Sequence, residues 1–210
     1  MANDTPLVKR AYNLGLKSVP NFANLPLRVI KYYERHLHEI PEALARGFIL
    51  PDILQLLSKN ESIVIDACDG TETLANAKEV FQGIDHELKN WSINKLCIAT
   101  KEQVVDVYQL VEDANFEEMF SSIGAELDKL CLTQHQIKSF CKKHRIWLRT
   151  YPYATFFLFK EERQFFIADV DEIYGSGHRE DLRVCGHRFE ERDFVCNGDA
   201  SHRVVVPRLS

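Results

Sequence analysis

The stretch LTQHQIKSFCKKH, from Leu132 to His144, is followed by ATFFLFK at Ala154–Lys160, and these two segments decide the fold. Thr133-Gln-His-Gln136 is a capping box, the sequence signature of a helix start. The buried stripe of this helix would consist of Ile137, Phe140 and Cys141. Lys142, Lys143 and His144 fall in the last turn, where cations complement the helix dipole. The second segment is short and apolar, which is typical of a buried strand.

Strand-like runs continue to the end of the chain, separated by turn signals that contain Gly, Asn or charged residues. The runs are Ala154–Lys160, Gln164–Val170, Leu182–Phe189 and Ser201–Val206, with Phe194–Cys196 as a short fifth candidate. One helix followed by consecutive hairpins predicts an α+β module with an antiparallel β-meander, either open or curled into a small barrel.

The preceding residues, 1–131, carry signals that predict a mainly helical region. Prolines mark three helix starts, at Pro26, Pro41 and Pro51. Thr100-Lys-Glu-Gln103 is a capping box, and apolar residues follow it at helical spacing, namely Val104, Val107, Tyr108 and Val111. Asn115–Glu118 predicts another helix that stops at Gly124. We therefore predict two regions, residues 1–131 and residues 132–210.

Composition supports this division. The chain has 210 residues, of which 45% are hydrophobic and 27% charged, as in ordinary globular proteins. Residues 1–131 hold 13 Lys and Arg against 20 Asp and Glu, a net charge of −7, whereas residues 132–210 hold 13 against 11, a net charge of +2. The total of −5 argues against a protein that binds nucleic acid by its overall charge.

The N-terminus lacks a basic region followed by an apolar stretch, so we expect no signal peptide and a cytoplasmic location. No apolar run reaches the roughly 18 residues that a membrane span needs. The six cysteines show no Cys-x-x-Cys pair and are expected to be free thiols. A zinc site would have to use Cys185, His187, Cys196 and His202. Their spacing does not match the usual zinc knuckles, so we predict no metal.

The quoted helix, together with Trp147–Thr150, Ala154–Lys160 and the closing run HRVVVPRL at His202–Leu209, resembles a module of a family of uncharacterised bacterial proteins. The segment from Ile63–Gly70 to Phe116–Phe120 resembles a partner that travels with this module. Together they cover about two thirds of the chain. The family has no assigned activity, so the resemblance implies a recurrent module and carries over no functional residue.

One enzymatic alternative comes from IVIDACDGT at Ile63–Thr71. It resembles the start of the haloacid dehalogenase-type phosphatases, in which a nucleophilic Asp after a strand is followed two residues later by a second Asp. Here Asp66 and Asp69 are three residues apart, and about sixty residues precede the motif. A turn in which Asp69 caps the next segment explains the same residues.

A second alternative is single-stranded nucleic-acid binding, because cationic and aromatic side chains alternate between Lys142 and Tyr153. The candidate binding residues are Lys142, Lys143, Arg145, Trp147, Arg149 and Tyr151. The same residues could instead finish the helix and fill the core.

No catalytic constellation and no Gly-rich cofactor loop stand out in this sequence. We therefore expect a non-enzymatic binding or protein-interaction protein, without a cofactor, whose partner is another protein, with nucleic acid as the alternative. If the sheet is open, Arg203–Val206 could be an edge strand that accepts a peptide.

Overall fold

The computed structural model describes Tyr33, His38 and residues 52–90, 95–174, 180–191, 196 and 201–209. The chain divides into two compact units, Met1–Pro51 and Asp52–Ser210. Apart from Tyr33 and His38, the helices predicted after Pro26 and Pro41 lie outside the described residues. The predicted boundary at residue 132 falls inside the second unit.

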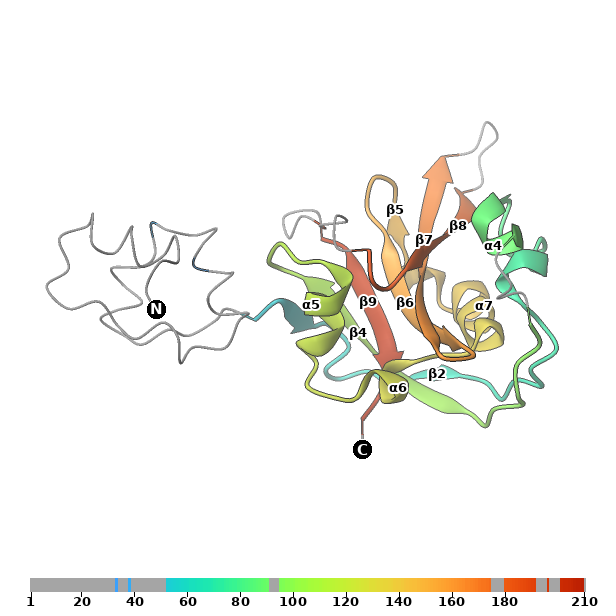
Figure 1. Cartoon of the computed structure of the whole chain (residues 1–210), viewed down its shortest axis with the longest axis horizontal. Helices are drawn as coiled ribbons and strands as arrows, with labels where there is room; N and C mark the ends of the chain where they lie inside the picture. The colour runs from blue at the N-terminus through green and yellow to red at the C-terminus, as the bar shows by residue number, and fades with distance from the viewer. Residues whose placement is uncertain are drawn as a thin grey trace, which may run out of the picture. The chain divides into compact units, whose positions relative to one another are not determined.

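The described residues of the second unit build a nine-stranded sheet. Its strands are β1 (Leu54–Leu56), β2 (Ile63–Ile65), β3 (Gly83–Ile84), β4 (Gln103–Leu110), β5 (Arg149–Thr150), β6 (Thr155–Glu161), β7 (Gln164–Tyr174), β8 (Glu180–Arg188) and β9 (Arg203–Pro207). The order across the sheet is β1-β4-β9-β6-β7-β8-β3; β2 also pairs with β4, and β5 with β7 (Figure 1). The sheet is open, so the α+β class is confirmed, and of the two predicted forms the sheet takes the open one.

The predicted meander is present as β6, β7 and β8, which pair antiparallel in sequence order. Strand β9 does not continue this meander. β9 lies between β4 and β6, antiparallel to the first and parallel to the second. The prediction that Arg203–Val206 forms a free edge strand is therefore wrong, because both edges of β9 already carry ladder hydrogen bonds.

The region before residue 132 is not mainly helical where it is described. The helix predicted after Thr100 is strand β4, and Thr100 forms a bridge with Cys68 instead of a cap. Val105 and Val107 lie on one face of β4, and Leu110 lies on the other. β-branched residues fit this half-buried pleated position better than a helix, so tertiary pairing decides the structure.

A neighbouring prediction fails for a similar reason. The segment after Pro51 forms the short strand β1, which pairs with the far end of β4. Farther along the chain, Leu74–Asn76 forms a 3-10 turn. Short apolar runs do not distinguish strands from helices by spacing alone, and here the open edge of β4 provides the hydrogen-bonding partners.

Two helices that capping boxes predicted are confirmed. Helix α7 (Gln134–Lys143) starts at Thr133, whose Oγ1 accepts a hydrogen bond from the Gln136 N–H at 3.2 Å. Helix α5 (Phe116–Ser121) starts at Asn115, whose Oδ1 accepts from the Glu118 N–H at 2.9 Å. Two shorter helices are α4 (His86–Asn90) and α6 (Leu127–Leu130). In each confirmed case the side chain satisfies a backbone N–H that the helix leaves unpaired.

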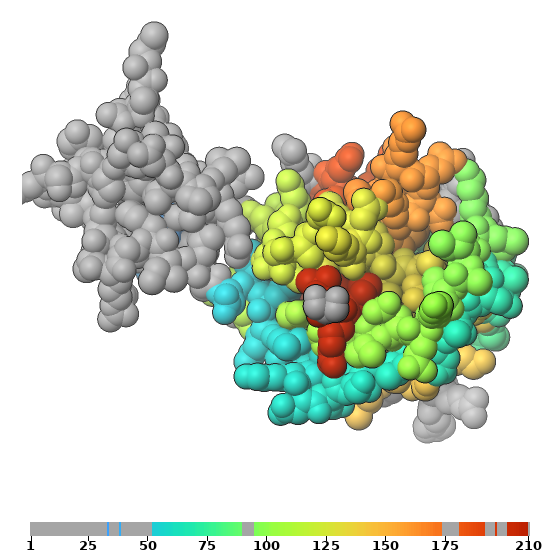
Figure 2. All heavy atoms as spheres, turned by 90° about the horizontal axis from the view of Figure 1, so that it is seen from below, coloured from blue at the N-terminus to red at the C-terminus, as the bar shows by residue number. Residues whose placement is uncertain are grey.

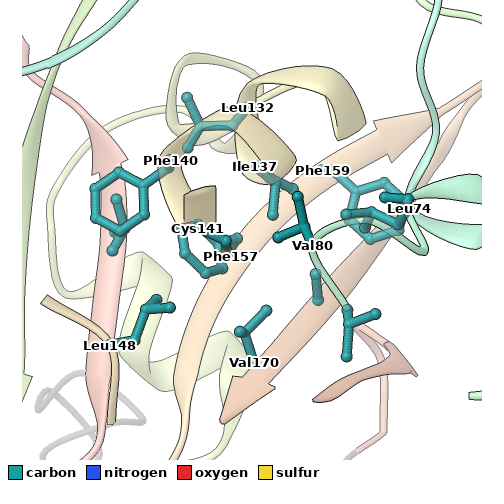
Figure 3. Close-up of a cluster of buried hydrophobic side chains, with 14 of the residues drawn as sticks. Leu74, Val80, Leu132, Ile137, Phe140, Cys141, Leu148, Phe157, Phe159 and Val170 are labelled. Atoms are coloured by element: carbon teal, nitrogen blue, oxygen red, sulfur yellow. The ribbon is translucent and has the colours of Figure 1, made fainter. Parts of the chain in front are cut away.

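Both faces of the sheet are covered, so the alternation along each strand divides the core into two clusters. Phe157 and Phe159 of β6 point to the face covered by α7, and Phe156 and Leu158 point to the face covered by α5 and α6. Figure 3 shows side chains of α7, among them Ile137, directed at the strands beneath. The sheet therefore forms the middle of three layers.

The end of β9 reaches the surface between α6 and the first strands, as the red residues in Figure 2 show. Arg208 fixes this end: its Nε donates to Asp106 Oδ1 at 2.8 Å, and its Nη2 donates to the Glu61 carbonyl at 2.7 Å. Within the described residues, no helix has the length and apolar character needed to cross a membrane.

Candidate anion-binding site

The structure separates the six predicted binding residues into two groups. Lys142 and Lys143 end helix α7, and Lys143 pairs with Asp66 at 2.6 Å. Arg145 is exposed in the 3-10 turn Arg145–Trp147. Lys142 and Lys143 thus belong to the last turn of α7, and Arg145 follows the helix in the same 3-10 turn as Trp147.

The second group consists of Trp147, Arg149 and Tyr151, which lie on and beside β5. Trp147 packs against the first core cluster, and the guanidinium of Arg203 lies over its ring, 5.6 Å from the centroid. Arg149 lies over the ring of Tyr153 at 5.3 Å. Arg203 comes from β9, 54 positions after Arg149. We refer to Arg149 and Arg203, with the rings of Tyr153 and Trp147 beneath them, as the paired-arginine site.

Thr155, the first residue of β6, brings the two arginines together. Its Oγ1 accepts a hydrogen bond from the Arg149 N–H at 3.0 Å. In the parallel pairing of β6 with β9, Thr155 is also the register partner of Arg203. Thr155 is fully buried, and it contacts Arg149 through its side chain and Arg203 through strand pairing.

Within the described part of the chain, neither arginine of the site forms an ion pair. The Nε atoms of Arg149 and Arg203 are both buried without a hydrogen-bond acceptor there. The hydrogen bond found for the Arg203 side chain runs from Nη1 to the carbonyl of Ile146, at 3.2 Å. Most of the N–H donors of these two guanidinium groups therefore have no acceptor among the described residues.

The electrostatics of the site agree with this geometry. Burial, and after it the charge of Arg149, lowers the pKa of the Arg203 guanidinium. A neighbouring positive charge disfavours the charged form of a cation, so the two guanidinium groups repel each other in the unliganded protein. Cation–π contact with the two rings offsets part of this cost.

Arg183 of β8 provides a contrast: it is the register partner of Asp171 of β7, which is also the register partner of Arg149. Arg183 lies over the ring of Tyr151 at 5.4 Å, but its Nε donates to Asp171 Oδ1 at 3.1 Å and its Nη2 bonds the other carboxylate oxygen. The bidentate pair neutralises Arg183. The paired-arginine site lacks such a carboxylate among the described residues.

His202, which directly precedes β9, supports the site. Its Nδ1 accepts a hydrogen bond from the Ala154 N–H at 3.0 Å, which leaves the ring proton on Nε2. The ring stacks on Phe156 at 5.3 Å and meets the edge of Tyr153 at 6.0 Å. Burial lowers the pKa of His202, so the ring is held neutral.

The two aspartates of the phosphatase alternative bind different parts of helix α7. Asp66 pairs with Lys143, whereas Asp69 accepts hydrogen bonds from Thr71 and lies 3.3 Å from His135 Nδ1. The two helix residues are eight positions apart, about 12 Å along the axis. Asp69 is thus a turn-capping residue, and nothing described brings both carboxylates to one cation.

The four residues considered for zinc lie around one carboxylate, that of Asp169, but not as a metal centre. Burial raises the pKa of the Cys185 thiol to about 11 and that of Cys196 to about 12, and the charge of Asp169 contributes to both. His187 contacts Asp169 and Glu191, and His202 holds Ala154. No three His, Cys, Asp or Glu side chains among the described residues are grouped so as to hold a metal ion.

The predicted segment from Lys142 to Tyr153 contains Trp147, Arg149 and Tyr153 of the paired-arginine site, and Trp147 and Arg149 were among the candidate binding residues. Arg203 and its neighbour His202 lie outside that segment. The available signal was the dipeptide His202-Arg203 at the start of a strand, since a cation in that position is unusual for a core strand. Its partner could be known only from the parallel pairing of β6 with β9.

Comparison with protein-family models, with curated proteins and with solved structures finds no match to this chain. The resemblance to a bacterial family therefore stays a prediction, and arguments about function rest on the paired-arginine site.

Proposed function

We propose that this protein is a non-enzymatic binding protein whose ligand carries an anionic group, bound between Arg149 and Arg203. One observation carries the proposal: both guanidinium groups have a buried Nε–H without an acceptor and no carboxylate partner among the described residues. The ligand would supply the negative charge and would accept hydrogen bonds from the terminal N–H groups, since the Nε–H groups themselves are buried.

The energetic argument is that the unliganded site is unfavourable and an anion would relieve it. A buried donor without a partner costs about 1–3 kcal/mol. Two adjacent half-buried cations add mutual repulsion, which is stronger inside a protein than in water. An anion between the forks would exchange repulsion for charge-assisted hydrogen bonds, whose geometry in arginine matches phosphate and carboxylate groups.

Single-stranded nucleic acid remains a second candidate ligand, and the exposure of Tyr151 favours it. This ring is 60% exposed beside the site and could stack on a base. Trp147 cannot do the same, because it packs against the core and carries Arg203 over its ring. The structure thus offers one stacking platform where the sequence offered several.

A protein partner, the expectation from sequence, would fit the same site through a carboxylate. The exposed Ile146 lies directly beside Arg203, to which its carbonyl is hydrogen-bonded. An apolar residue next to an acidic side chain of the partner would match this arrangement.

The test is thermal unfolding of the full chain in sodium phosphate and in sodium chloride at equal ionic strength. A ligand that binds only the folded state raises the unfolding temperature in proportion to its occupancy. We expect phosphate to stabilise the wild type and to lose its effect in Arg149→Gln and in Arg203→Gln.

Arg163→Gln is the matched control. Arg163 is an exposed arginine in the turn between β6 and β7, at the opposite end of β6 from the site. It should respond to phosphate like the wild type. An equal response of all four proteins would show that phosphate acts generally and would overturn the proposal, as would no response in any of them.

A further inference from the structure

We infer that the anion of the paired-arginine site is a phosphomonoester dianion, and this inference rests on the function proposed above. Neither guanidinium has an ion-pair partner among the described residues, so the site presents two positive charges to the ligand. A phosphomonoester carries nearly two negative charges at neutral pH, whereas a carboxylate or a phosphodiester carries one.

The contrast with Arg183 gives the charge argument an internal reference. In that pair one guanidinium is matched by the one charge of Asp171, with both carboxylate oxygens bonded. The same sheet therefore neutralises a cation with an internal carboxylate where no ligand is needed. Asp171 is also the register partner of Arg149, but its carboxylate bonds Arg183, and no described carboxylate forms an ion pair with Arg149 or Arg203. A single negative charge from a ligand would therefore leave one of these two cations unpaired.

The number of donors points to the same group. Because both Nε–H groups are buried, the donors within reach of a ligand are the terminal N–H groups of the two arginines, of which one on Arg203 already donates to Ile146. A phosphomonoester offers three strong acceptor oxygens in a tetrahedral arrangement. It can therefore accept from two separate forks at once, whereas the two oxygens of a carboxylate lie in one plane.

The forks are held in place before any ligand arrives. Tyr153 supports Arg149 and is itself contacted by His202, which stacks on Phe156 in the core. Trp147 supports Arg203 in the same way. Fixed donors lose little conformational entropy on binding, so a small anion can bind there without extensive further contacts.

The side of the site next to solvent leaves room for the rest of the ligand. Ile146 is 86% exposed beside Arg203, and the ring of Tyr151 is exposed two positions after Arg149. The ester oxygen and its organic group would leave the site between these two side chains. A terminal phosphate meets this geometry, because only one of its oxygens is esterified.

The experiment compares adenosine 5′-monophosphate with its methyl ester, a phosphodiester with the same nucleoside and one charge fewer. Binding of each to the full chain is measured by titration calorimetry at pH 7 and at pH 5. We expect the monoester to bind about tenfold more tightly than the diester at pH 7, because of the additional charge beside two cations.

The ratio of the two affinities is the decisive quantity. The second pKa of a phosphomonoester is about 6, so the dianion falls about tenfold between pH 7 and pH 5, and the ratio should fall with it. The titratable and charged groups facing the site are His202, which directly precedes β9, Asp169 and Asp171 of β7, and Arg183 of β8. A positive charge gained by any of these groups at pH 5 would favour the dianion over the monoanion and so raise the ratio. A fall in the ratio therefore reports protonation of the ligand.

Variants complete the test. Arg149→Lys and Arg203→Lys keep the charge but remove the fork, and each should reduce the preference for the monoester, while Arg163→Gln keeps it. Equal affinities for the two esters at both pH values would overturn this inference and leave the proposed function standing. The inference also fails if phosphate stabilises the protein through both arginines but neither ester binds. If neither ester binds and phosphate has no effect, the proposed function fails as well.

An oligonucleotide with and without a 5′-phosphate distinguishes a free nucleotide from the end of a chain. Tighter binding of the phosphorylated oligonucleotide supports recognition of a terminal phosphate. Equal binding of both oligonucleotides would show recognition of internal phosphodiesters, against the inference.

Discussion

His187 of β8 faces Asp169 of the neighbouring strand β7, with 3.4 Å between Nε2 and Oδ2. On the other side of the ring, Nδ1 lies 3.4 Å from Oε2 of Glu191. Burial disfavours the imidazolium, but the hydrogen bond and the charge of Asp169, with those of Glu191, outweigh it and raise the pKa of His187. The folded protein therefore holds this proton more tightly than the unfolded chain does.

His187 should stabilise the protein at mildly acidic pH. Because its pKa is raised on folding, its contribution is fully present below the ordinary value of 6.5 and is lost as the pH rises through the folded-state pKa. We expect the difference in unfolding free energy between wild type and His187→Gln to shrink on going from acidic to alkaline pH. Urea unfolding across this range measures it. A difference independent of pH would contradict the assignment.

His202 should act with the opposite sign. Burial lowers its pKa, so the unfolded chain takes up the proton first as the pH falls below 6.5. The stability that the neutral ring contributes is therefore present above that pH and lost below it. In His202→Asn this loss on acidification should be smaller than in the wild type. A steeper loss in the variant, seen by the same urea measurement, would count against a neutral buried ring.

Gly70 should tolerate no side chain. Its φ angle is +79°, and a Cβ there would lie 2.2 Å from the carbonyl oxygen of Cys97, whose N–H donates to the Gly70 carbonyl at 2.9 Å. We expect Gly70→Ala to lower the unfolding free energy by more than about 2 kcal/mol. Gly124→Ala is the control: φ is +77° but the space is open, so only the strain of about 1 kcal/mol applies. Equal losses would show that the contact with Cys97 is unimportant.

Arg149→Met should not destabilise the protein without ligand. The substitution removes a buried donor that lacks an acceptor and one of two repelling charges, while its side chain can still pack on Tyr153. We expect the unfolding free energy to rise by about 1 kcal/mol, as for a residue retained for binding and not for folding. A loss of similar size, measured in chloride without phosphate, would assign Arg149 a structural role.

Local signals in the sequence predicted the elements whose stabilising contacts are local. The capping boxes at Thr133 and Asn115 close within four residues, and the strands β6, β7 and β8 follow one another closely in sequence and pair in that order. Strand β4 was predicted as a helix, because Val104, Val107, Tyr108 and Val111 also fit a helical stripe and only pairing with β2 and β9 excludes it. Strand propensity and the spacing of apolar residues do not indicate which strands pair.

The candidate site could be predicted only in part for the same reason. Arg149 and Tyr151 stood out because cationic and aromatic residues alternate along one segment. Arg203 lies 54 positions away, in a run that reads as an ordinary strand. The two arginines meet only because β9 returns to the middle of the sheet, next to Thr155. A functional pair of this kind depends on strand order, which the sequence of neither segment reveals.

The central position of β9 also affects how the protein is made. The ribosome synthesises β9 after every other strand of the sheet, yet this strand joins β4 to β6. Until it emerges, a nascent chain can form the β6–β7–β8 hairpins, but the edges of β4 and β6 stay open to other strands. Assembly of the complete sheet must therefore wait until residues 203–207 have left the ribosome, and a chain that stops before them exposes two apolar edges to aggregation.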